Sequence, residues 1–227
     1  MFLSCRAHDH ARYRDAILDG LTELAELAAA AGIDSTIFIL GGSAIALVEG
    51  ARRRTTTDID SYIRSSAIDR TNLFDIIDEI AQRRRWPNTW LNTAAEQFLP
   101  DAEQEPIVWV GVLEVARIRV LCAPPPLLLA MKLRSNRGRR DTGDLPFLLA
   151  ATGATQRRHV EEFFAIYFPH DDISPKCQNW LDQNGYPVEV DAPTAAWSPP
   201  TFDRADQQYV DTYLRDGEWI AGYWRKR

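Results

Sequence analysis

Residues 35–63, STIFILGGSAIALVEGARRRTTTDIDSYI, contain the pattern that decides the fold. The run from Ser35 to Leu40 is apolar and β-branched and ends at a glycine pair, so it predicts a buried strand. The next residues, Ser43 to Val48, predict a short helix that ends near Gly50. After a basic turn, residues 55–63 alternate between two kinds of side chain and predict a second strand. The order is therefore strand, glycine pair, helix, strand.

Two carboxylates on the second predicted strand are the first candidates for chemistry. In a strand, Asp58 and Asp60 would point to the same face, about 7 Å apart along the chain. Such a pair can hold Mg²⁺ jointly, or bridge two ions about 3.5–4 Å apart. Because like charges repel, a nearby cation would be needed to compensate them. An exposed edge strand with two solvated aspartates is the alternative interpretation.

The glycine pair strengthens the functional interpretation of the two aspartates. Gly41, Gly42 and Ser43 form a junction between strand and helix, where backbone N–H groups are available and the absence of Cβ atoms lets a phosphate approach. Ser43 could add a hydroxyl donor. A plain strand-to-helix turn is the alternative for the glycines alone. Taken with the aspartates, the order predicts a triphosphate at one strand end and its metals on the neighbouring strand.

A second motif follows three prolines in an apolar helical segment. Lys132 is the only charged residue among several leucines there, and we expect it to neutralise the β- and γ-phosphates. A lysine whose ammonium extends to solvent from a helix end is the alternative. Arg139 and Arg140 come next, followed by Asp141 and Asp144, which are three residues apart and would share a helix face. The aspartates could orient Lys132 or an arginine, or supply a further metal ligand or base, although a helix N-terminus alone also favours Asp141.

The two motifs together resemble a known family. GGSAIALVEGARRRTTTDIDSYI resembles the signature of the nucleotidyltransferase superfamily, and the second motif is similar to that of the AbiEii and MenT type of toxin nucleotidyltransferase. The resemblance covers about residues 35–150. It implies Mg²⁺-dependent transfer of a nucleoside monophosphate from an NTP to an acceptor hydroxyl. The acceptor would be a tRNA 3′ end or a protein side chain, and a toxin–antitoxin setting would add an antitoxin as a partner.

The resemblance also implies roles for individual residues. Asp58 and Asp60 would be the metal ligands, with one or two Mg²⁺ ions. The arginines of the second motif, with Lys132, would stabilise the charge that develops as pyrophosphate leaves. The expected catalytic residues are Asp58, Asp60, Lys132, Asp141 and Asp144, and the expected nucleotide-binding residues are Gly41, Gly42, Ser43, Arg139 and Arg140.

A third catalytic carboxylate, present in many polymerase-like members of the superfamily, has no clear counterpart. The strand predicted over 112–121 offers only Glu114, with Arg117 and Arg119 close by. Either Glu114 or the aspartates of the second motif take this part, or the protein works with two carboxylates. The alternatives are therefore a non-catalytic nucleotide-binding regulator or antitoxin-like protein on the same fold, and a small-molecule nucleotidyltransferase of the aminoglycoside type.

The rest of the chain predicts an α/β fold with a mixed sheet flanked by helices. Residues 1–150 would form the nucleotidyltransferase-like core, and residues 151–227 a helical C-terminal region with a proline-rich linker near 185–202. Besides those already described, helices are expected over 13–31, 72–84, 141–151, 160–167 and 205–224, and a strand over 107–110.

Composition limits the setting. The net charge is −6, whereas residues 51–140 carry 15 basic against 11 acidic side chains, so a tRNA partner is allowed but not strongly favoured. The longest apolar runs are far shorter than a membrane-spanning helix requires. Three scattered cysteines predict free thiols in a reducing cytoplasm.

One further basic stretch allows two interpretations. Arg83, Arg84 and Arg85, with Trp86 and Trp90, could contact nucleic acid through phosphates and a stacked base. A solvated helix end followed by a structural tryptophan is the favoured interpretation.

Overall fold

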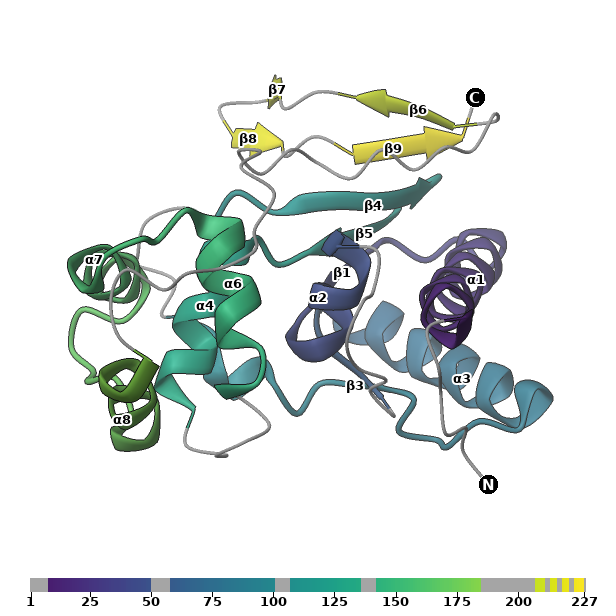
Figure 1. Ribbon diagram of the computed structural model, residues 1–227. Coiled ribbons are helices and arrows are strands. Elements are labelled where there is room, and N and C mark those ends of the chain that lie inside the picture. Colours follow the sequence, from purple (N-terminus) through teal and green to yellow (C-terminus); the bar gives the residue numbers. More distant parts are fainter. Residues whose placement is uncertain are drawn as a thin grey trace. The chain divides into compact units, whose positions relative to one another are not determined.

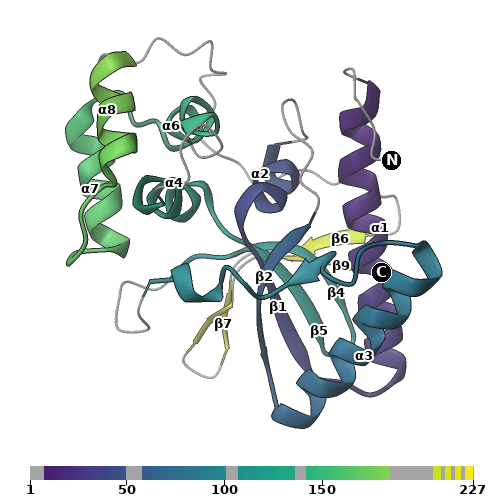
Figure 2. The same ribbon diagram turned by 90° about the horizontal axis from the view of Figure 1, so that it is seen from below.

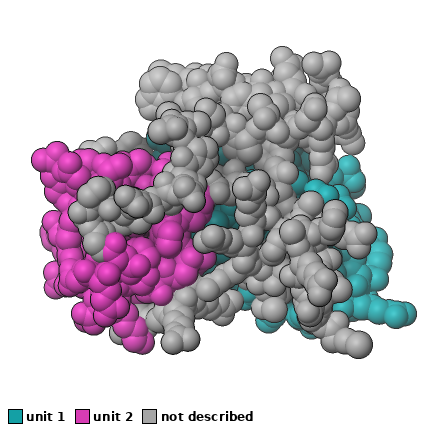
Figure 3. Space-filling view, viewed as in Figure 1, with its two compact units in different colours: residues 1–97, 108–123, 200–227 teal, residues 98–107, 124–199 magenta. Residues whose placement is uncertain are grey.

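The computed structural model describes residues 8–49, 58–100, 107–135 and 142–184, together with four short strands within 207–226 (Figure 1). The chain divides into two compact units (Figure 3). The first consists of residues 1–97, 108–123 and 200–227, and the second of residues 98–107 and 124–199. This division differs from the expected boundary at residue 150, because the helices of the second motif belong with those that follow it.

The first unit contains a mixed sheet, so the expected α/β class with a mixed sheet is confirmed. β1 (Ser35–Ile39) pairs antiparallel with β2 (Ile59–Ser65) and parallel with β5 (Ile118–Cys122). The full order is β3-β2-β1-β5-β4-β9-β6, where the remaining strands are β3 (Leu91–Asn92), β4 (Val110–Val115), β9 (Tyr223–Lys226) and β6 (Gln207–Val210).

One face of this sheet forms the core of the first unit. Ile37 of β1 lies in register with Ile63 of β2 and Val120 of β5, and all three are almost fully buried. Two helices, α1 (His8–Ala30) and α3 (Ala67–Arg84), pack on the same side of the sheet (Figure 2). We place both helices over the face that bears Ile37 and Ile63. Arg64 lies on the opposite face of β2 and is exposed.

The helix expected over 13–31 is confirmed in α1. Its apolar residues at spacings of four, three and four (Ile17, Leu21, Leu24 and Ala28) are all buried. α3 begins earlier than expected, because the Ser66 hydroxyl accepts a hydrogen bond from the Asp69 N–H and caps the helix.

Three predictions about strands and helices were wrong. The strand expected over 107–110 is not a separate element, because of these residues only Val110 is in a strand, and it begins β4. The single strand expected over 112–121 is a hairpin, in which β4 and β5 are joined by a turn at Ala116 and Arg117, with Ala116 at φ 52°. An alanine in this left-handed region gives no signal that sequence patterns can recognise. The helix expected over 205–224 is replaced by β6, β7 (Tyr213–Arg215), β8 (Glu218–Ile220) and β9. Aromatic and β-branched residues make up half of these strands and favour extended backbone.

The second unit is helical in its described part. α4 (Pro125–Arg134) packs against α6 (Leu145–Thr152) and α7 (Arg157–Tyr167), and α8 (Pro175–Asn184) follows. The Ser174 N–H donates to the carbonyl of Leu133 and ties the start of α8 to the end of α4. The proline-rich stretch 185–202 lies outside the described residues. Among the helices that are described, none combines the length and the apolar character that crossing a bilayer requires.

Candidate functional site

Strand direction brings the glycine turn and the second strand to the same edge of the sheet. β1 runs towards Gly41, and the antiparallel β2 starts beside it, with Ile39 in register with Ser61. The Leu40 N–H then donates to the Asp60 carbonyl at 2.8 Å. Immediately after this bond the chain turns into α2 (Gly41–Glu49). The two parts of the first motif, separate in sequence, are therefore neighbours in space.

Gly41 lies so close to Asp60 that a residue with a Cβ at this position would displace the Asp60 carboxylate. Gly41 has φ +60°, and a Cβ added to it would lie 2.5 Å from Asp60 Oδ2. The first hydrogen bond of α2 joins the Ala44 N–H to the Leu40 carbonyl at 3.2 Å. The N–H groups before Ala44 belong to the first turn, where a helix has no carbonyl of its own to offer them. The positive end of the α2 dipole thus lies against the Asp60 carboxylate.

Ser43 connects the helix to the second strand. Its side chain is buried, and its hydroxyl donates to the Asp58 carbonyl at 2.9 Å. A serine hydroxyl has one proton to give. In this structure the proton is used within the protein, which makes Ser43 a residue that positions Asp58.

Asp58 and Asp60 share one face, as the alternation of the sequence predicts. Asp58 directly precedes β2 and Asp60 lies within it, and both are half-buried. The residues between and after them, Ile59 and Ser61, are buried on the opposite face. The burial pattern therefore puts both aspartates on the face away from Ile59 and Ser61, and the Asp60 carboxylate lies next to the first turn of α2.

Asn92 joins this group and was missed in the sequence. It lies on β3 in register with Asp60, and its Nδ2 is 3.4 Å from Asp58 Oδ2. The Ala94 N–H donates to Asn92 Oδ1 at 3.0 Å, so the amide is oriented with its donor group towards Asp58. β3 has only two residues, too few for a periodic pattern in the sequence. An asparagine directly after the buried Trp90-Leu91 pair was the only available signal.

Glu114 does not lie at this edge. Val110, at the start of β4, is in register with Cys122, which is itself in register with Ile39 next to the glycine turn. Glu114 comes four residues after Val110 on β4 and pairs with Arg119. It therefore lies about 13 Å from this edge. It cannot supply a third carboxylate to Asp58 and Asp60 from there. Within the described ranges, no group of three His, Cys, Asp or Glu side chains is arranged to hold a metal.

The second motif forms a contact of its own in the second unit. Lys132 on α4 is 7% exposed, and its Nζ lies 2.9 Å from Asp144 Oδ2 at the start of α6. This ion pair agrees with the expectation that an aspartate of the motif could orient Lys132. It does not agree with the alternative, in which the lysine extends into solvent. The other three residues of the motif, Arg139, Arg140 and Asp141, lie outside the described residues.

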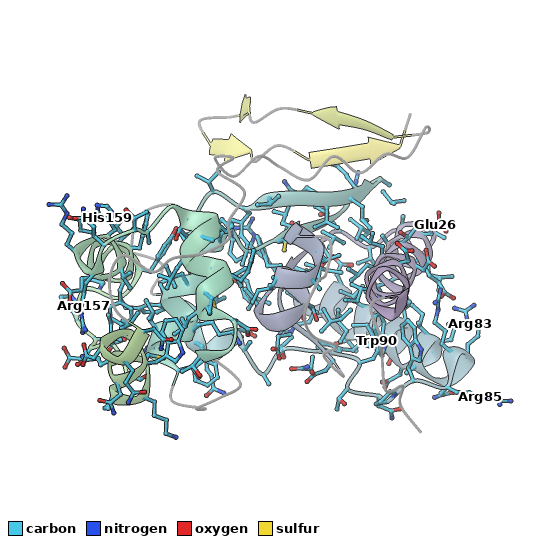
Figure 4. The ribbon with its side chains drawn as sticks, in the orientation of Figure 1. Glu26, Arg83, Arg85, Trp90, Arg157 and His159 are labelled. Carbon is cyan, nitrogen blue, oxygen red and sulfur yellow. The ribbon has the colours of Figure 1, made fainter. Side chains whose placement is uncertain are left out.

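The basic stretch at the end of α3 makes ion pairs with α1. Arg83 binds Glu23 of α1 at 2.7 Å, and Arg84 contacts the same carboxylate. Trp90 is 3% exposed, and its Nε1 donates to the Ile77 carbonyl at 3.0 Å. Arg83 and Trp90 both lie near α3 in Figure 4. The favoured interpretation, a helix end followed by a structural tryptophan, is confirmed.

The two cysteines in the described part are free thiols, as expected. Cys122 is buried beneath α2, and its Sγ donates to the Ala44 carbonyl at 3.5 Å. Burial raises the pKa of this thiol well above its ordinary value. Cys122 is therefore a neutral packing residue under the site.

The chain matches no family model, no curated protein and no solved structure. The residues and their geometry are accordingly the basis for assigning a function.

Proposed function

We propose that the first unit carries a Mg²⁺-dependent nucleotidyltransferase site. It would transfer a nucleoside monophosphate from an NTP to an acceptor hydroxyl, on a tRNA 3′ end or a protein side chain, as the toxin of a toxin–antitoxin pair. The observation that carries the proposal is the close approach of Asp60 to Gly41, 2.5 Å from where a Cβ would lie. It brings the Asp60 carboxylate to the N-terminus of a helix, with Asp58 two residues away, and this supports a site that handles a metal-bound phosphate.

The first turn of α2 suits the phosphates. Gly41 and Gly42 carry no side chain that would keep an oxygen from their N–H groups. The helix dipole favours negative charge at the same place. In the proposed reaction these N–H groups grip the triphosphate and stabilise the pyrophosphate as it leaves.

The carboxylate pair suits Mg²⁺. Asp58 and Asp60 are half-buried on one face and offer the hard oxygen donors that this ion prefers. Mg²⁺, when bound, would neutralise phosphate charge and lower the pKa of the attacking hydroxyl. Asn92 holds Asp58 through its amide, which fixes the direction in which that carboxylate presents its oxygens.

The reaction balances without an oxidant or reductant. The acceptor oxygen forms a bond to the α-phosphorus, and the bond between that phosphorus and the bridging oxygen to the β-phosphate breaks. The acceptor proton passes to Asp60, to Asp58 or to solvent, and pyrophosphate leaves with the bridging electron pair. In this proposal the leaving group would lie at the start of α2, where the helix dipole favours negative charge.

A non-catalytic nucleotide-binding protein is the second candidate. The position of Glu114, four residues along β4 from the edge, favours it because a third carboxylate is then not supplied by that strand. The expected role of Lys132 and Asp144 stays a prediction for either candidate.

Label transfer from NTPs tests the proposal. The protein would be incubated with Mg²⁺ and each α-labelled NTP, together with a mixture of tRNA and protein acceptors. We expect label on one acceptor class, and its loss in Asp60→Asn, which keeps the shape of the side chain and removes its charge. Asp75→Asn, an exposed aspartate on α3, is the matched control and should transfer normally.

The two candidates give different results in this assay. Transfer that disappears in Asp60→Asn and persists in Asp75→Asn supports the enzyme. Calorimetric binding of an NTP without any transfer supports the non-catalytic candidate. No binding and no transfer contradict both.

A further inference from the structure

Three aromatic rings lie on the sheet face that bears Asp60. Tyr62 is two residues beyond Asp60 on β2 and lies in register with Phe38 of β1. The rings of Tyr62 and Phe38 are stacked, with centroids 5.3 Å apart and an angle of 22° between their planes. Trp109, just before β4, approaches the other side of Phe38 with a centroid distance of 4.5 Å. We call Tyr62, Phe38 and Trp109 the aromatic row.

The outer rings of this row are accessible. Phe38 is 3% exposed and serves as the buried centre, whereas Tyr62 and Trp109 on either side are only half-buried. Val108, next to Trp109, is 64% exposed. Arg64 is exposed on the same face, with its guanidinium carbon 5.2 Å from the Phe38 ring centroid. The row therefore presents π surface with a cation beside it, next to the proposed metal ligands.

We infer that the aromatic row binds the nucleobase of the incoming nucleoside triphosphate by stacking, an inference that rests on the proposed function. Tyr62 lies about 7 Å along β2 from Asp60, roughly the distance that one ribose spans between a phosphate and its base. Planar rings with a nearby arginine are the surface that bases prefer, because stacking and cation–π attraction add. The turn at Gly41 would hold the phosphates and the row would hold the other end of the same molecule.

A single nucleotide fits this face better than a strand of RNA. A polynucleotide site needs a series of cations that follow the phosphates. Among the residues of this face whose side chains the structure describes, the strands supply Arg64 and Arg119, and Arg119 lies in register with Glu114. Within this described set Arg64 is the exposed arginine, so one cation is available beside one base.

Stacking alone makes the specificity broad. Every base has a π face, so rings without hydrogen-bonding partners distinguish bases mainly by stacking strength. We therefore expect all four NTPs to bind, with the purines binding more tightly than the pyrimidines.

Calorimetry with two ligands separates the base from the phosphates. ATP and inorganic tripolyphosphate would be titrated into the full-length protein with Ca²⁺ in place of Mg²⁺, which keeps turnover low. ATP should bind more tightly than tripolyphosphate. Tyr62→Ala and Trp109→Ala should each weaken ATP binding about 5- to 100-fold and leave tripolyphosphate binding unchanged. Unchanged tripolyphosphate binding also shows that each variant is folded.

Two further variants serve as controls. Tyr62→Phe keeps the ring and should bind ATP like the original protein. Phe74→Ala removes a ring of α3 in the same unit, which lies under Arg70 at 5.8 Å, and should change neither affinity.

The outcomes distinguish this inference from the proposed function. Equal affinities for ATP and tripolyphosphate, or ATP binding unaffected by Tyr62→Ala and Trp109→Ala, overturn the stacking site while leaving the phosphate site intact. Loss of binding to a single-stranded oligonucleotide in these variants, with ATP binding unchanged, also overturns it and assigns the row to the acceptor. Failure of tripolyphosphate to bind the unmodified protein contradicts the proposed function itself.

Discussion

Replacing Gly41 by alanine tests the contact that carries the proposed site. At φ +60°, a residue with a Cβ costs about 1–2 kcal/mol in the folded state, partly offset by about 0.4–1 kcal/mol from a stiffer unfolded chain. The new Cβ would lie 2.5 Å from Asp60 Oδ2, well inside the 3.0 Å that such carbons tolerate. The carboxylate must then leave its rotamer, at about 0.5–1.5 kcal/mol. We expect the free energy of unfolding to fall by about 2 kcal/mol.

Gly32→Ala isolates the part that concerns Asp60. Gly32 belongs to the same unit and has φ +74°, but a Cβ there would have no neighbour within 4 Å. It should lose about 1 kcal/mol from the backbone alone. Urea unfolding followed by far-UV circular dichroism measures both variants.

Transfer activity should separate the two variants more than stability does. Displacing a reacting group by a fraction of an ångström costs on the order of 10-fold to 100-fold in rate. We expect that loss in Gly41→Ala and near-normal transfer in Gly32→Ala. Equal losses of stability and of transfer in the two variants would refute the reasoning, because the close approach of Asp60 to Gly41 would then have no effect of its own.

Three other predictions follow from contacts in the two units. Asn92→Ala removes the amide that donates to Asp58. It should raise the Mg²⁺ concentration for half-maximal transfer several-fold and lower the free energy of unfolding by only about 1 kcal/mol. An unchanged Mg²⁺ titration would contradict this prediction. Lys132→Met leaves the partly buried Asp144 carboxylate without its cation and should cost about 3 kcal/mol in urea unfolding, at the lower end of the range for buried pairs. The double variant Lys132→Met/Asp144→Leu should recover much of that loss, and no recovery would argue against the pair. Burial raises the pKa of Cys122, so the thiol should stay unreactive towards iodoacetamide at pH 8 until the protein unfolds, as followed by mass spectrometry of its peptide; rapid labelling of the folded protein would contradict this.

The first motif could be predicted from the sequence because its signals are local. An apolar β-branched run predicts β1, and a glycine pair marks its end. Alternation over Asp58 to Ile63 predicts the shared face of the two aspartates. These patterns depend on neighbours a few residues apart, so no knowledge of the rest of the chain was needed.

Other parts of the site depend on distant residues and could not be predicted. Asn92 reaches Asp58 only because β3 pairs with β2, and a strand of two residues has no recognisable period. Glu114 looked suitable in sequence, but its distance from the edge follows from the register of β4 on β5.

The C-terminal strands are a different case, because a signal was present. Asp216-Gly217 separates Arg215 from Glu218, which face each other across β7 and β8, and such a dipeptide favours a two-residue hairpin. Tyr209, Tyr213 and Trp219 were instead expected to lie on a helix over 205–224. Strands of three or four residues are too short to distinguish a strand period from a helix period. The Asp216-Gly217 dipeptide is therefore the better indication of the structure in this region.

The antiparallel pairing of β1 with β2 leaves the length of the connection between them open to change. The chain leaves the sheet at Gly41 and returns to the same edge at Asp58, so the segment after α2 has to span only about the length of that helix, roughly 13 Å. Doubling a flexible linker costs only about 0.6 kcal/mol, whereas a linker joining opposite edges would have a minimum span. Insertions between Glu49 and Asp58 should therefore be tolerated, and an epitope or a protease site could be added there while the glycines and aspartates stay in place.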